Sequence, residues 1–524
     1  MRRSVINKSS VMFIVATLLF TLLTQLTFAQ SSVFSTIPLI RTGDSIGTDG
    51  GRFIGATMGL HGLNDFGELG LQLTGAGCGN AAFILSETRT LELTESCKDT
   101  GLGKLVLDAP VNINDRGDLV FQAHRTDAPF FGKRVLALYL GGQLTKILTQ
   151  GDVISSSGVF GGCSSTEMNI NNHGDVAFMA CAISGGNFPE FDLYALSGGL
   201  LRKAVSDGQV IPLGQIALGA YAVWPVFIND KNEILFNADL ITSPVQKPRS
   251  GLFLATPDGI KKVVLDGDPL PVSKIKRETS MIGNLNNKGE VVFLASLRNR
   301  QIDRGIFVLS ESKFSKVMVL GDDSPLGGTF SGIPPQEPEG RPSINDNGVV
   351  AFSAFVKGGT SDLGIFLSLG NAIVKVVALG DRLPTGEAIY RITSYALNNH
   401  GQVAFSAFLV DDNGTKSSGV FLCNPIKPSI SSIKLKRRSQ GLELQVNGSG
   451  LIINDTIIEI NGMPLERMIY PKEFHEDGGL TTRVVSKDVR IEGLIPIGEP
   501  VEVRVLNRIT GRRSEPVVLN RESM

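Results

Sequence analysis

The sequence has few of the residues that usually carry catalysis or bind metals. Its 524 residues include five histidines, five cysteines and one tryptophan. No pair of cysteines has the Cys-x-x-Cys spacing of redox or zinc sites, and His124 has no histidine or cysteine partner at metal-ligand spacing. The motifs of zinc proteases, serine hydrolases and phosphate-binding loops are missing. The sequence therefore favours none of these enzyme classes, and we expect neither a metal ion nor another cofactor.

The sequence also lacks an excess of charge of either sign. It has 50 basic and 51 acidic residues, a formal net charge of −1. This balance disfavours a nucleic-acid partner, because nucleic-acid binders normally carry a basic excess. Basic residues do cluster locally, as in Lys434, Lys436, Arg437 and Arg438. We interpret such clusters as solvated faces, with an acidic polymer or envelope surface as the alternative partner.

Long apolar runs are missing except at the N-terminus. Arg2, Arg3 and Lys8 precede apolar residues 11–28, and Thr27-Phe28-Ala29 offers a small-residue cleavage site. We predict a signal peptide over residues 1–29; the alternative is an uncleaved anchor, because the run approaches the length of about 18 residues that spans a membrane. We expect an exported, monomeric protein, extracellular or periplasmic, with no stable membrane insertion after cleavage.

What the sequence does contain is a sevenfold repeat: Asn, Asp or Asn, any residue, Gly, and then alternating apolar residues. The Asn recurs every 50 to 59 residues, a period typical of solenoids, propellers and arrays. Three residues later stands Gly in six copies and Asn232 in the other, as expected for a type I turn followed by a left-handed residue. We therefore predict hairpin turns, with calcium-loop or catalytic roles as distant alternatives. The leading residues are Asn64, Asn114, Asn171, Asn229, Asn286, Asn345 and Asn398.

A strand should follow each turn. Six copies carry Phe-x-Ala in register, as in Phe352 and Ala354, and helix-period segments are hard to find after residue 30, so we expect an all-β protein. Each unit continues with a Gly-bounded apolar strand and a further strand that ends near Gly-Asp. Four strands in about 57 residues is typical of a propeller blade.

The ends of the repeat indicate a closed ring. The last unit lacks its final strand, whereas residues 35–41 form such a strand without a unit. Because pairing the two would remove exposed sheet edges, we predict a seven-bladed β-propeller over residues 30–424, closed by the N-terminal strand. Six blades plus an insertion is the alternative, because the Gly-Asp signature is lost near residues 97–103.

The five cysteines suit an oxidising compartment. Cys78 and Cys97 flank a predicted strand pair, and Cys163 and Cys181 flank the third turn within one position of register. We predict these two local disulfides, which leaves Cys423 unpaired. The alternative is a set of buried free thiols.

Residues 425–524 break the repeat. Alternating strands such as Leu442 to Val446 and Val501 to Val505, with turns at Asn447-Gly448 and Asn461-Gly462, predict a small β-sandwich of immunoglobulin-like type.

Two parts of the chain resemble known types. The units beginning Ile344-Asn345 and Leu397-Asn398 resemble repeats of secreted bacterial proteins of uncharacterised function that are taken to be β-propellers. The C-terminal segment is similar to the immunoglobulin-like IPT/TIG domain in its pattern around Leu444, Gly448 and Gly462. That similarity implies a domain that spaces or presents other modules; the repeat resemblance implies no activity.

Function is therefore sought in residues that do not repeat. Trp224 and Tyr221 form the most unusual aromatic pair and are our weak binding candidates, although space-filling between blades is the plainer interpretation. The Asp residues of the Gly-Asp turns could form an acidic site, but Asp is common in such turns. We expect a secreted, non-catalytic binding or scaffold protein whose partner is an extracellular protein or polymer. The alternative is a propeller hydrolase or lyase that acts on a polymer in its central funnel.

Overall fold

The computed structural model describes residues 33–522 except 47–50, 54–59, 61, 76–78, 95–98, 109–110, 127–132, 156–157, 165–167, 184–189, 219–225, 244–246, 277–280, 300–301, 335–339, 370–371, 440, 472–474 and 477–479. The predicted signal peptide lies outside these residues. Within them, no helix is both long and apolar enough to cross a membrane.

The repeats form antiparallel sheets. The first four units contain β4 (Leu69–Gly75), β5 (Gly79–Leu85) and β6 (Thr90–Glu92); β7 (Leu105–Leu107), β8 (Asn112–Ile113), β9 (Leu119–Arg125), β10 (Arg134–Leu140) and β11 (Gln143–Thr149); β12 (Val153–Ser155), β13 (Gly158–Ser164), β14 (Asn169–Ile170), β15 (Val176–Ile183), β16 (Glu190–Ser197) and β17 (Leu200–Val205); β18 (Val210–Ile211), β19 (Gly214–Ala217), β20 (Phe227–Ile228), β21 (Ile234–Ile241), β22 (Arg249–Thr256) and β23 (Gly259–Leu265).

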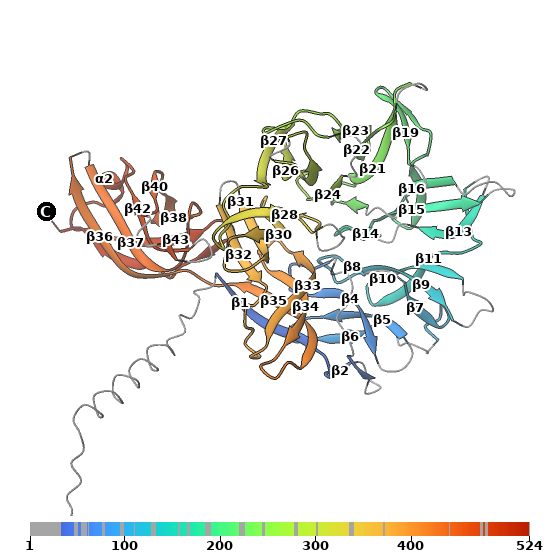
Figure 1. Cartoon of the computed structure of the whole chain (residues 1–524), viewed down its shortest axis with the longest axis horizontal. Helices are drawn as coiled ribbons and strands as arrows, with labels where there is room; N and C mark the ends of the chain where they lie inside the picture. Colours follow the sequence, from blue (N-terminus) through green and yellow to red (C-terminus); the bar gives the residue numbers. More distant parts are fainter. Residues whose placement is uncertain are drawn as a thin grey trace, which may run out of the picture.

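The remaining three units complete the ring. They contain β24 (Ile282–Leu285), β25 (Val291–Ser296), β26 (Arg304–Ser310) and β27 (Lys313–Val319); β28 (Thr329–Gly332), β29 (Ser343–Ile344), β30 (Val350–Lys357), β31 (Leu363–Leu369) and β32 (Ala372–Ala378); β33 (Ala388–Leu397), β34 (Val403–Val410) and β35 (Lys416–Pro425) with β1 (Phe34–Arg41). A two-stranded hairpin joins β2 (Ser45–Ile46) to β3 (Gly51–Arg52). Figure 1 shows the sheets following one another in chain order around a common centre, a propeller-like arrangement.

The turn and core predictions are confirmed. The residue three after each repeated Asn has positive φ, including Asn232 with φ 58°, the conformation for which Gly and then Asn are preferred. The repeated Phe side chains are buried. In several units this Phe stacks on an aromatic side chain of the following strand, as Phe352 does on Phe366, with ring centroids 5.5 Å apart. Alternating apolar positions therefore place one face of each sheet strand in the core.

The N-terminal strand joins the last unit, as predicted. β1 pairs antiparallel with β35, and Thr36 lies opposite Cys423. Val33 and Phe34 are buried in the same apolar cluster as Phe421. The strand therefore covers an edge of β35 that would otherwise present unpaired backbone groups.

The third sheet contains the predicted disulfide between Cys163 and Cys181, whose Cα atoms are 5.4 Å apart. This pairing follows from β13 lying beside β15 in antiparallel register. Cys423 is a buried free thiol, and burial raises its pKa to about 12. Cys78 and Cys97 lie outside the described residues.

The C-terminal segment forms two further antiparallel sheets and a short helix. The first contains β36 (Ser429–Arg438), β37 (Gly441–Ile452), β40 (Met468–Ile469), β41 (His475–Glu476) and β42 (Leu480–Ser486); the second contains β38 (Thr456–Ile460), β39 (Met463–Pro464), β43 (Pro500–Asn507), β44 (Arg512–Arg513) and β45 (Val517–Asn520); the helix is α2 (Ile491–Leu494). Leu444, Ile458 and Val503 belong to one buried cluster shared by the two sheets.

The two parts of the chain are packed together. Ile452, Leu480 and Ile509 of the C-terminal segment are buried in the same cluster as strands of the sixth and seventh repeat units. A Cβ atom at Gly401, in the last repeated turn, would lie 3.4 Å from the carbonyl oxygen of Ile509. The turn after β43 therefore rests directly on the last turn of the ring.

Candidate functional site at the centre of the ring

Each repeated Asn first organises its own turn. In the third unit, Asn171 Oδ1 accepts hydrogen bonds from the backbone N–H groups of His173 and Asp175, at 3.0 and 2.9 Å. The other six units repeat both contacts. The Asn carbonyl thus satisfies donors that the tight turn leaves without a ladder partner.

The amide nitrogen of the same Asn reaches the next unit. Asn114 Nδ2 donates to the backbone oxygen of Asn171 at 2.8 Å, and Asn171 Nδ2 donates to that of Asn229 at 3.1 Å. The series continues through all units. It closes where Asn398 Nδ2 donates to the backbone oxygen of Asn64 at 2.9 Å. Seven buried side chains therefore form one continuous ring of hydrogen bonds around the centre.

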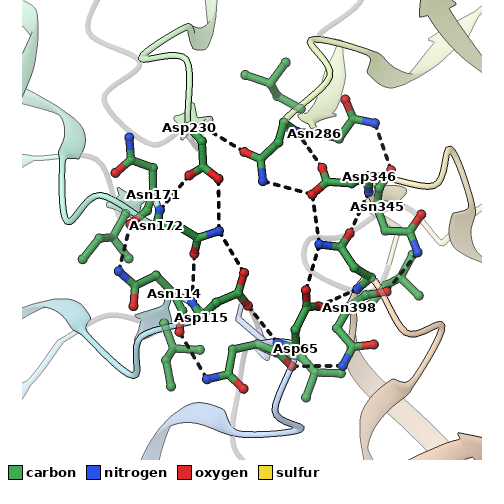
Figure 2. A pocket seen from close by; sticks show the side chains of 18 of the residues that line it. Asp65, Asn114, Asp115, Asn171, Asn172, Asp230, Asn286, Asn345, Asp346 and Asn398 are labelled. Carbon is green, nitrogen blue, oxygen red and sulfur yellow. Dashed lines mark hydrogen bonds between the residues drawn. The ribbon is translucent and has the colours of Figure 1, made fainter.

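The following residue of each turn forms a second ring. The backbone N–H of Asp65 donates to Asp115 Oδ1 at 2.8 Å, and the N–H of Asp115 donates to Asn172 Oδ1 at 2.9 Å. The pattern passes through the remaining units. The N–H of Asn399 closes it on Asp65 Oδ1 at 2.8 Å. Figure 2 shows these side chains converging around the centre.

Carboxylates and amides alternate in this second ring. Its members in order are Asp65, Asp115, Asn172, Asp230, Asn287, Asp346 and Asn399. The amide nitrogens donate to adjacent carboxylates, as Asn172 Nδ2 does to Asp115 at 2.8 Å and to Asp230 at 3.1 Å. An odd number of positions cannot alternate completely, and the exception is the Asp65–Asp115 pair. Burial raises the pKa of Asp115, and the neighbouring charge of Asp65 acts in the same direction.

The rings line a central cavity of about 170 Å³. Its wall consists of the Asn and Asx residues and of the Leu or Ile that precedes each turn, such as Leu63 and Ile113. These lining residues include no hydroxyl, thiol or basic side chain, and their only ionisable groups are the carboxylates of Asp65, Asp115, Asp230 and Asp346. The carboxylates accept hydrogen bonds from neighbouring amides, so the polar groups of the cavity wall are hydrogen-bonded to one another. Among the described residues, no group of three or more His, Cys, Asp or Glu is placed to hold a metal ion.

Asp115→Asn is expected to stabilise the protein by roughly 0.5–1 kcal/mol at neutral pH, because it removes one of two adjacent negative charges and supplies an amide that can donate to Asp65. Asn172 Nδ2 loses its bond to Asp115 in this variant but keeps Asp230 as an acceptor. The folded-state pKa of Asp115 lies above its ordinary value of 3.8, so the folded protein binds this proton more tightly than the unfolded chain does. The free energy of unfolding of the wild type should therefore fall as pH rises through the interval just above 3.8, and the variant should lose this decline. Thermal unfolding between pH 4 and 7 measures both effects.

Asp230→Asn is the matched control, because Asp230 already stands between two amides and its replacement removes a needed acceptor. It should destabilise the protein. Equal shifts for the two variants would show that the alternation has no energetic role.

The candidates from the sequence have different outcomes. Trp224 and Tyr221 lie outside the described residues. The Gly-Asp carboxylates serve their own turns: Asp322 Oδ2 accepts the backbone N–H of Val319 at 2.9 Å and forms an ion pair with Lys316, and Asp152, Asp268 and Asp381 do the same. His173 and His400 are exposed at turn tips.

Sequence reasoning missed the links between units. The alternation of Asp and Asn at the second turn position is visible in the sequence, but it becomes meaningful only when those positions are neighbours around a ring.

A ring of antiparallel sheets around a self-bonded polar centre defines a propeller-like repeat protein. Residues 76–426 match the model of a family of unknown function (DUF7453). This match covers more than half of the chain, so the protein belongs to that family.

Several solved structures are similar to the chain at low identity. The β-propeller domain of the Trilobed protease from Pyrococcus furiosus has 10% identity and a TM-score of 0.38, with coverage of 70% of this chain and 95% of that one. The polysaccharide lyase Uly1 has 9% identity and a TM-score of 0.36, with coverage of 75% and 99%. A chain from a study of two prolyl endopeptidases has 9% identity and a TM-score of 0.38, and this chain spans 56% of its length. The search of curated proteins found no match.

Proposed function

We propose that this protein is a secreted, non-catalytic binding or scaffold protein. Its parts would be a signal peptide (1–29), a seven-bladed β-propeller (30–424) closed by the N-terminal strand, and an immunoglobulin-like sandwich of IPT/TIG type (425–524). The seven members of each hydrogen-bonded ring support the blade number. The shared core of the two C-terminal sheets supports the sandwich.

The observation that carries the proposal is that the repeated polar residues are already bonded to one another. Asn171, for example, uses both ends of its side-chain amide within the protein. Breaking such bonds to bind a substrate would expose buried polar groups without partners, at about 1–3 kcal/mol for each. The centre is therefore suited to hold the ring rigid, and binding falls to residues outside the repeat pattern.

The proposal is tested by capture of cell-surface material from the producing organism on the immobilised mature chain. At about 0.3 M NaCl, contacts that depend on exposed charges are screened. Capture should persist in Asp65→Asn, which alters only the central ring, and in a chain without residues 427–524 that retains a cooperative thermal transition. Trp224→Ala, at our weak aromatic candidate, should weaken it.

Two results would contradict the proposal. Loss of capture in the truncated but folded chain would move binding to the C-terminal domain. Cleavage of a captured polymer, measured as new chain ends and lost in both Asp65→Asn and Asp115→Asn, would instead establish an enzyme with its site in the central cavity.

A further inference from the structure

One face of the first C-terminal sheet carries an excess of positive charge. Leu435, Leu444 and Val484 pack into the core of this domain, so the alternate residues of β36, β37 and β42 point to the opposite face. The charged residues of that face, with Lys487 directly after β42, are Lys434, Lys436, Arg438, Arg483, Lys487 and Glu443. Five cations against one carboxylate leave an excess of four positive charges.

The single carboxylate is neutralised within the face. Glu443 lies 3.0 Å from Arg438 and 3.8 Å from Lys487, and its side chain is 9% exposed. The hydrogen bond from Arg438 holds the pKa of Glu443 below its ordinary value, and Lys487 and Lys436 contribute. Glu443 therefore remains ionised and buried beneath the cations, and it offers little negative charge to a partner.

The lysines of β36 are the most available cations. Lys434 is exposed, and no ion pair of Lys434 occurs in the described part of the chain. Lys436 Nζ donates to the neutral side chain of Gln445 at 3.1 Å. Side chains on alternate residues of a strand repeat about every 7 Å, so Lys434, Lys436 and Arg438 present an evenly spaced row along the edge strand of the sheet.

Neutral polar groups accompany this row. Arg483 Nε donates to Asn447 Oδ1 at 3.0 Å, and Asn447 Nδ2 donates to Ser432 Oγ at 2.8 Å. Strands β36, β37 and β42 contain no Phe, Tyr, Trp or His that could stack on bases or insert at a membrane interface. Evenly spaced cations beside hydroxyl and amide groups match an extended chain that carries both carboxylates and hydroxyls.

We propose that this basic face binds an anionic polysaccharide. The contact with the repeat domain uses Ile452, Leu480 and Ile509. Strand β36 begins four residues after β35 and in Figure 1 runs away from the ring of sheets, so its C-terminal half, which contains Lys434, Lys436 and Arg438, lies toward the far end of the domain. A polymer can therefore occupy it without displacing the propeller. The inference goes beyond the proposed function, because it adds a second contact whose ligand need not be that of the propeller.

The test is affinity electrophoresis of the full mature chain in gels containing polygalacturonate, a carboxylated polysaccharide, with neutral dextran as the reference. We expect retention by polygalacturonate at about 50 mM NaCl and its loss at about 0.5 M NaCl. Lys434→Gln/Lys436→Gln should weaken binding by roughly 20- to 30-fold, because each lysine near an anionic surface contributes about fivefold.

The matched control is Lys261→Gln/Lys313→Gln. It removes the same charge from exposed positions on β23 and β27 of the repeat domain, and it should leave binding unchanged. Thermal unfolding of both variants checks the fold. Absence of retention by polygalacturonate, or equal weakening by the two pairs, would overturn the proposal. The proposal would also be overturned if the chain bound duplex DNA or phosphatidylglycerol vesicles more tightly than polygalacturonate and Lys434→Gln/Lys436→Gln abolished that binding. The partner would then belong to another class of molecule.

Discussion

Asn171→Ala is expected to lower the free energy of unfolding by about 3–5 kcal/mol. The substitution removes the acceptor of the backbone N–H groups of His173 and Asp175. It also removes one of the two donors to the backbone oxygen of Asn229, which keeps the N–H of Asn232. Asn171 and Asp175 are buried, so water cannot readily replace the lost bonds. The effect should be large because one side chain stabilises both its own turn and the contact with the next sheet.

His173→Ala is the control for this prediction. It alters the same turn two residues later, at an exposed side chain, and should change stability by less than about 0.5 kcal/mol. Thermal and urea unfolding of both variants give the comparison. If Asn171→Ala were as mild as His173→Ala, the ring of hydrogen bonds would be a consequence of the fold and not a source of its stability.

The second large effect is a gain of stability from Thr36→Cys. Thr36 lies directly opposite Cys423 across β1 and β35, and Thr36 Oγ1 is 3.3 Å from Cys423 Sγ. Directly opposed residues of an antiparallel pair have Cα separations within the range that disulfides accept. The new bond would join residues 387 positions apart and tie the first strand covalently to the last unit. We expect about 2–4 kcal/mol of added stability under oxidising conditions.

Thr36→Ser serves as the control, because it keeps the hydroxyl and cannot form the bond. The wild type with and without reductant reports the joint contribution of Cys163–Cys181 and of the predicted Cys78–Cys97 bond. Peptide mapping should find residues 36 and 423 linked, and reductant should abolish the gain. A variant whose two thiols stay free after oxidative refolding would contradict the pairing of β1 with β35.

The local features of the fold could be predicted from the sequence because they depend on neighbouring residues. Six of the turns have Gly and the fourth has Asn232 at a position where the backbone has positive φ, a conformation that few other residues adopt. Alternating apolar residues such as Val350, Phe352 and Ala354 indicate a strand with one buried face. The Cys163–Cys181 bond followed from counting residues on both sides of one turn, because antiparallel register is set locally.

Contacts between units could not be predicted in the same way. The role of the repeated Asn in its own turn already accounts for its presence in the sequence. Nothing in the sequence indicates that its side-chain amide also donates to the backbone of a residue 50 to 59 positions away. The basic face was visible only as a run of Lys and Arg. Strand β36 decides which of these residues point outward, and β37 and β42 bring Glu443, Arg483 and Lys487 beside them.

The sequence by itself determined the all-β class, the seven turns and the joining of the first strand to the last unit, because turn chemistry, apolar alternation and an unpaired end strand are local properties. Only the tertiary structure decided that the repeated Asn side chains form a closed ring and that Asp65 and Asp115 are the adjacent carboxylates that interrupt the alternation of the second ring. It also decided that the C-terminal domain rests on Gly401. The physical reason is that a hydrogen bond or a charge pair depends on distance in space. The ring brings together residues as far apart in the chain as Asn64 and Asn398.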